Sequence, residues 1–190
     1  MNRGIFSCII TVVILLLSGS AYAQLTAGAQ LTVSVPENCL IDTNGAPVNL
    51  TLVAPVAGSS LPIVSNSNMY LRISSIVPGN TKRKVSVRIS SGAVPAGTRL
   101  TLGTAASTSS SGAGKRGVVS PTITLSGAEQ TIISDIGSCY TGTGYTDGYR
   151  LTYTWGPYNS QTDYQLITAT TTPVTITVLF TISAPDGNNY

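Results

Sequence analysis

The sequence predicts an all-β protein built as an antiparallel two-sheet sandwich of about eight or nine strands. Thr, Ser, Gly, Val and Ile dominate the chain, and the Lys- and Glu-rich stretches typical of surface helices are missing. Several short segments alternate apolar and polar residues, which is the two-residue period of a strand with one buried face. Turns containing Gly and Pro separate these segments, and no window of helix length shows the helical period of about 3.6 residues.

The alternation is clearest near the two ends of the predicted mature chain. Between Leu25 and Val35 every second residue is apolar, and this run is longer than the usual strand of about five or six residues. A second clear strand covers residues 174–183, where only Leu179 interrupts the polar face. The Ser-, Thr-, Ala- and Gly-rich residues 103–117 are predicted to form a flexible loop. Shorter strands are predicted at 48–53, 69–77, 84–90, 98–102, 122–125, 131–134 and 149–155.

Residues 1–23 have the pattern of a secretory signal peptide. Arg3 gives a basic start, residues 5–17 form an apolar run, and Ala21 and Ala23 form an Ala-x-Ala cleavage pattern. The apolar run is shorter than the roughly 20 residues of a membrane span, so an N-terminal anchor is the less favoured alternative. Cleavage before Gln24 would leave a single sandwich domain, residues 24–190, which we expect at the cell surface or outside the cell.

Two cysteines, Cys39 and Cys139, remain after the predicted cleavage. An even number of cysteines in an oxidising compartment predicts a disulfide between them. Closing a loop of about 100 residues would contribute on the order of 4–5 kcal/mol to stability in the chain-entropy model. The alternative is a pair of buried free thiols.

The residue types present argue against catalysis, a cofactor and a metal site. The chain has no histidine, which excludes His-dependent nucleophilic and acid–base catalysis and removes the commonest metal ligand. The seven carboxylates form no close pair in the sequence, so a hydrolase that combines scattered acids is the least favoured functional class. The formal net charge of +3 is too small to indicate nucleic-acid binding.

Aromatic residues concentrate between residues 140 and 164. Strand parity places Tyr149, Tyr153 and Trp155 on the same face as Leu151, and this face is predicted to enter the core. Packing inside the fold is one interpretation of the remaining rings, and a surface that stacks on sugar rings is the other. The candidates for that surface lie in turn-like segments and are Tyr140, Tyr145, Tyr158 and Tyr164.

The signal peptide, the alternating segment from Leu25 to Val35 before Cys39, and the C-terminal strand at 174–183 resemble pilin-type subunits of bacterial surface fibres. They are also similar to the related spore-coat-U type of secreted domain. The resemblance implies an incomplete immunoglobulin-like sandwich, whose gap is filled by an N-terminal strand donated by the next subunit. It implies a donor strand within residues 24–35, with a donor face of Leu25, Ala27, Ala29 and Leu31.

The resemblance also implies partners: other copies of the chain or related subunits, and an assembly chaperone.

One feature departs from the common pilins, in which the second cysteine follows the first by a few tens of residues. Here only Cys139 is available to pair with Cys39. The alternative for residues 25–35 is the first strand of the chain's own sandwich.

Two functions from different classes follow. The first is a structural or adhesive subunit of a cell-surface fibre, assembled by strand donation. The second is a monomeric secreted binding module, which would use the exposed aromatic residues to bind surface glycans. Neither function is enzymatic.

Overall fold

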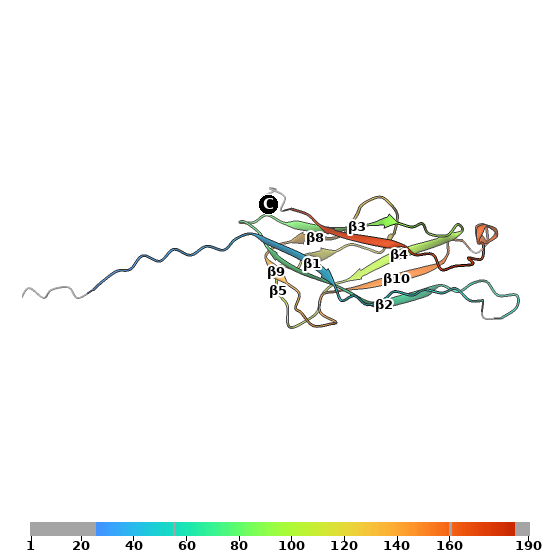
Figure 1. Cartoon of the computed structure of the whole chain (residues 1–190), viewed down its shortest axis with the longest axis horizontal. Helices are drawn as coiled ribbons and strands as arrows, with labels where there is room; N and C mark the ends of the chain where they lie inside the picture. The colour runs from blue at the N-terminus through green and yellow to red at the C-terminus, as the bar shows by residue number, and fades with distance from the viewer. Residues whose placement is uncertain (1–25, 55, 160, 185–190) are drawn as a thin grey trace, which may run out of the picture. The chain divides into compact units, whose positions relative to one another are not determined.

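The computed structural model describes residues 26–54, 56–159 and 161–184. Within them the chain forms eleven strands in two antiparallel sheets, which confirms the predicted all-β sandwich (Figure 1). The chain divides into two units, residues 1–35 and residues 36–190, and all the strands of the described residues belong to the second unit. The predicted signal peptide at 1–23 and the donor-face residue Leu25 lie outside the described residues.

The larger sheet has seven strands. Its main order is β5-β9-β2-β10-β4-β7, and β1 pairs with β2 on the edge opposite β9. The long strand β2 therefore organises this sheet, because β1, β9 and β10 all pair with it. The strands are β1 (Asn38–Thr43), β2 (Val64–Ile76), β4 (Thr98–Ala105), β5 (Ala113–Gly114), β7 (Ile123–Thr124), β9 (Cys139–Tyr140) and β10 (Tyr149–Pro157).

The smaller sheet has four strands in the order β11-β3-β8-β6. Figure 1 shows β3 and β8 in one layer and β2 and β10 in the other. A single 3₁₀ turn, Tyr164–Leu166, lies between β10 and β11 in the chain. The strands of this sheet are β3 (Arg83–Ser91), β6 (Val118–Val119), β8 (Gln130–Ile136) and β11 (Thr177–Ile182).

Inward-facing residues of the two sheets form one hydrophobic core. Alternate residues are buried in β10 and in the second half of β2, as their two-residue period predicted. In β3, Val85 and Val87 are buried as predicted, but Ser86 between them is buried as well. Tyr149 and Tyr153 belong to this core, which confirms their assignment to the buried face. The members with no exposed surface are Leu71, Val85, Leu102, Ile133, Ile136 and Leu151.

Three segments differ from the sequence prediction. No strand forms in residues 48–53, although Val48 and Leu50 still pack their side chains against the core. The predicted flexible loop at 103–117 includes the end of β4 and all of β5, and Arg116 folds it back by donating hydrogen bonds to the Ser107 hydroxyl and the Ser109 carbonyl. No strand forms in residues 26–35 of the single chain, so the alternative in which this segment is the first strand of its own sandwich has no support among the described residues.

The described residues contain no helix that is long and apolar enough to cross a membrane.

Candidate functional site

One side of the sandwich ends in two edge strands, β1 and β11, and we call this side the open edge. β1 pairs only with β2 and β11 pairs only with β3 among the described strands, so each leaves one row of backbone N–H and C=O groups without a strand partner. The two strands contact each other across the sandwich. Unpaired strand edges are templates for pairing with another chain.

Burial decreases toward the open edge. Neither β1 nor β11 contains a fully buried residue, whereas their neighbours Ile73 and Val87 are at most 3% exposed. The inward side chains of the edge strands are half-buried and pack against the core from one side. They are Ile41 from β1 and Val178, Phe180 and Ile182 from β11.

A buried arginine joins β1 and β11 at one end of the open edge. The Arg83 guanidinium donates to the Glu37 carboxylate, just before β1, and to the carbonyl oxygen of Ser183, just after β11, at 2.8 Å. Arg83 is 4% exposed, and its Nε has no hydrogen-bond partner among the described residues. We call this three-residue contact the Arg83 clasp.

The predicted donor segment directly precedes the clasp in the chain. Residues 26–35 form no strand, and the side chains described for them are exposed. The larger apolar ones are strongly so: Leu31 is 86% exposed, and Val33 and Val35 are each 81% exposed. Of the predicted donor face, Ala27, Ala29 and Leu31 are exposed, and none of them belongs to a strand.

The two cysteines are free thiols, contrary to the predicted disulfide. Cys39 of β1 and Cys139 of β9 pair with the same residue, Ser75, on its two opposite sides. Two interstrand spacings separate their Cα atoms by about 10 Å, beyond the roughly 7 Å that a disulfide can bridge. The alternative prediction of two free thiols fits this arrangement, with Cys139 buried and Cys39 half-buried.

We expect the mature chain to show two thiols per molecule without reductant, measured with a thiol reagent after denaturation. In the native protein the reaction should be slow, because burial raises the pKa of both thiols and keeps the reactive thiolate scarce. The same shift lowers stability as the pH rises above the ordinary cysteine value of about 8.5, since only the unfolded chain then ionises freely. A denatured chain with no free thiol would contradict this arrangement.

The four candidate tyrosines do not form one surface. Tyr140 lies on β9 and Tyr145 on the loop from β9 to β10, whereas Tyr158 follows β10 and Tyr164 lies in the 3₁₀ turn. The length of β10 separates the two pairs by about 30 Å. The Tyr158 ring makes a cation–π contact with Arg99, whose guanidinium lies 5.0 Å from the ring centre.

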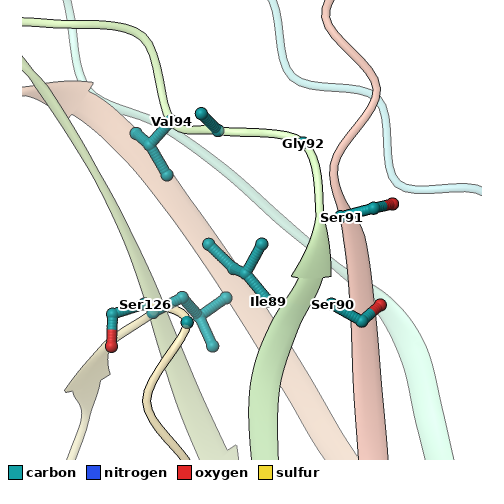
Figure 2. A pocket seen from close by; sticks show the side chains of 9 residues that line it. Ile89, Ser90, Ser91, Gly92, Val94 and Ser126 are labelled. Atoms are coloured by element: carbon teal, nitrogen blue, oxygen red, sulfur yellow. The ribbon is translucent and has the colours of Figure 1, made fainter.

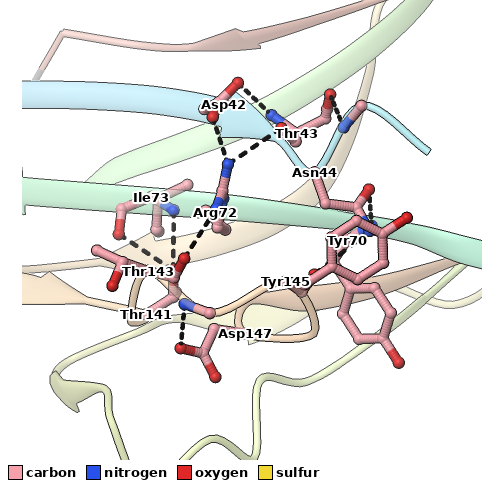
Figure 3. A network of polar contacts seen from close by, with 12 residues as sticks. Asp42, Thr43, Asn44, Tyr70, Arg72, Ile73, Thr141, Thr143, Tyr145 and Asp147 are labelled. Carbon is pink, nitrogen blue, oxygen red and sulfur yellow. Dashed lines mark hydrogen bonds and ion pairs between the residues drawn. The ribbon is translucent and has the colours of Figure 1, made fainter.

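Of these four tyrosines, Tyr145 lines a concavity of about 260 Å³, and its aromatic neighbour there is Tyr70. The sequence analysis did not identify Tyr70. The parity of β2 contained the relevant signal, because inward-facing Leu71 and Ile73 place Tyr70 on the outer face of the sheet. Figure 3 shows the Tyr70 and Tyr145 rings side by side.

The Asn44 side chain fixes the segments around this tyrosine pair. Its Nδ2 donates to the carbonyl oxygens of Asn68 at 2.9 Å and Tyr145 at 3.3 Å. Its Oδ1 accepts from the backbone N–H groups of Tyr70 at 3.1 Å and Ala46 at 3.3 Å. One side chain thereby connects the β1–β2 loop, β2 and the β9–β10 loop (Figure 3).

Polar side chains also hold the β9–β10 loop in place. Arg72 donates to the carbonyl oxygen of Thr143 at 3.0 Å. Asp147 accepts from the Ser109 hydroxyl at 2.6 Å and from the Gly144 N–H at 2.7 Å, and these bonds lower the pKa of its carboxyl. The loop that carries Tyr145 is therefore fastened both to β2 and to the segment after β4.

A second concavity of about 350 Å³ lies where β3 ends. Its apolar lining residues are Ile89, Ala93, Val94 and Leu125, and serines and glycines line the rest. Figure 2 shows the Ile89 side chain pointing toward Val94 beside the end of β3, with Ser126 on the neighbouring segment. No ionisable side chain lines this concavity, so it offers a place for an apolar group and no acid–base chemistry.

Three carboxylates serve as partners of basic side chains. Asp42 pairs with Arg72 at 2.6 Å, Asp135 pairs with Lys82 at 2.9 Å, and Glu37 belongs to the Arg83 clasp. The hydrogen bond from Lys82 is the main reason that the pKa of Asp135 is lowered. Within the described part of the chain, no group of three His, Cys, Asp or Glu residues is placed to hold a metal ion.

Comparisons of the chain with protein-family models, curated proteins and solved structures found no match.

Proposed function

We propose that the chain is an exported subunit of a bacterial cell-surface fibre, and that its copies assemble by strand donation. In this proposal, residues 24–35 of one copy add a strand to the open edge of the next. Two features of one chain carry the proposal together. The first is the open edge, whose inward apolar residues are only half-buried, and the second is the exposed segment of residues 26–35, whose sequence alternates like a strand.

The chemistry of the two parts is complementary. A strand placed between β1 and β11 would satisfy unpaired backbone groups, and its alternate side chains would cover the half-buried residues of the open edge. In addition to the predicted donor face, Val33 and Val35 continue the same alternation and carry larger side chains than Ala27 and Ala29. Burying Leu31, Val33 and Val35 would contribute roughly 1.5–3 kcal/mol each.

Truncation tests the proposal. The mature chain beginning at Gln24 should form oligomers or fibres in size-exclusion chromatography and electron microscopy. A chain beginning at Pro36 should stay a folded monomer, because it keeps every strand and lacks the donor. Equal, compact monomers from both chains would count against strand donation and favour the alternative of a monomeric binding module.

A peptide experiment tests the same site without requiring assembly. A synthetic peptide of residues 24–35, added to the chain that begins at Pro36, should raise its Tm by about 10 °C or more. This follows from about 5 kcal/mol of added burial and roughly 2–4 °C per kcal/mol for a domain of this size. A peptide with the same composition in scrambled order should leave the Tm unchanged.

A further inference from the structure

We propose that the concavity between Tyr70 and Tyr145 is a binding site for a neutral saccharide ring. This site is separate from the open edge and does not depend on strand donation. The concavity has a volume of about 260 Å³, which is below the range of about 300–1,000 Å³ typical of drug-sized ligands and is suited to one sugar unit of a longer glycan. Its lining residues are Ala46, Pro47, Ser67, Asn68, Tyr70, Tyr145 and Thr146.

The lining determines the class of ligand. No charged side chain is present, so the site offers no attraction to phosphate, carboxylate or ammonium groups. It combines two aromatic rings with hydroxyl and amide groups from Ser67, Asn68 and Thr146. A sugar ring matches this combination, because its C–H face can stack on tyrosine while its hydroxyls exchange hydrogen bonds with the polar groups.

A β-bulge presents two of these polar residues. In the pairing of β2 with β10, Leu151 is opposite Met69 and Tyr153 is opposite Asn66. Ser67 and Asn68 therefore lie opposite the single residue Thr152, to which Ser67 is hydrogen-bonded at 3.1 Å. Bulges redirect side chains and are frequent beside functional sites. Here the two bulge residues line the same concavity as Tyr70 and Tyr145.

The site is held in shape before any ligand binds. Asn44 contributes four hydrogen bonds to the backbone of the surrounding segments, and Arg72 and Asp147 fasten the loop that carries Tyr145. Tyr145 nevertheless remains 62% exposed, so this ring contributes little to the core. Because the backbone of the loop that carries this ring is already held in place, a ligand would order less of the chain on binding.

Calorimetry with the intact mature chain tests the inference. The probes are neutral oligosaccharides of glucose, galactose and mannose, titrated to about 10 mM, which is tenfold above a Kd of about 1 mM. We expect at least one of them to bind. The Tyr145→Ala and Asn68→Ala variants should each bind it about tenfold or more weakly, with an unchanged Tm because both side chains are exposed.

Tyr158→Ala is the matched control, because this ring is 60% exposed at the other end of β10 and should be dispensable for sugar binding. The inference would be overturned if no oligosaccharide binds, or if Tyr145→Ala and Tyr158→Ala weaken binding equally. Binding of a proline-rich peptide at Tyr145 in place of every sugar would also overturn it, because tyrosine pairs can accept proline rings too. These readouts stay informative whether or not the chains assemble.

Discussion

Replacing Leu31 with aspartate should abolish assembly while leaving the subunit folded. Leu31 is 86% exposed in the single chain, so the substitution removes no packing from the sandwich. In the assembled state the same position would face the open edge of the next copy. There the change removes about 2–3 kcal/mol of apolar burial and adds several kcal/mol for desolvating a carboxylate. The association constant should fall by about 10³-fold or more, measured by size-exclusion chromatography and sedimentation.

Thr32→Asp provides the matched control for this experiment. It introduces the same charge one residue later, on the polar face of the alternation, where a donated strand would leave it in water. Assembly of this variant should remain close to that of the unmodified chain. If both variants lose assembly, the effect is one of charge alone. If both assemble normally, residues 24–35 are not the donor.

Replacing Gly148 with alanine should produce the largest loss of stability from a single added methyl group. Gly148 has a φ of +101°, which L residues rarely adopt, and it immediately precedes the buried Tyr149. A Cβ at this position would overlap the backbone carbonyl of Leu71, the residue paired with Tyr149 in the neighbouring strand. The strain and the separation of β2 from β10 should cost about 3 kcal/mol or more.

Thermal and urea unfolding would measure this cost. We expect the Tm of Gly148→Ala to fall by roughly 6–12 °C, at about 2–4 °C per kcal/mol. Gly127→Ala is the control, because an added Cβ there meets nothing within 4 Å and its φ is not positive. Its free energy of unfolding should change by less than about 0.5 kcal/mol. Equal losses in the two variants would contradict the close approach of Gly148 to β2.

Strands with a strict two-residue period could be predicted from the sequence, and those without it could not. In β3, Val85 and Val87 are buried and Lys84 is exposed, as the alternation predicted. β1 was missed because its outward face carries Leu40, which is 60% exposed, while its inward face carries Thr43. At an edge strand the inward face is only half-buried, so the selection for an apolar pattern is weaker there.

The candidate sites depended on information that a residue pattern lacks. The alternation between Leu25 and Val35 shows that the segment can form a strand, but the pattern does not specify which chain supplies the partner edge. The number of cysteines predicted a disulfide but could not show which strands carry them. The pairing of β1 and β9 with β2 places Ser75 between Cys39 and Cys139, which keeps the two thiols apart. The candidate tyrosines were separated by the length of β10, which sequence proximity concealed.

The Arg83 clasp has a mechanical consequence. In a fibre linked through residues 24–35, tension enters each subunit at Pro36, one residue before the clasp. Without the clasp this pull would peel β1 from β2 one hydrogen bond at a time. Because Glu37 is joined through Arg83 to β3 and to the end of β11, the load is shared between both sheets from the first residue. The force needed to unravel a subunit should therefore fall when Arg83 is replaced by methionine.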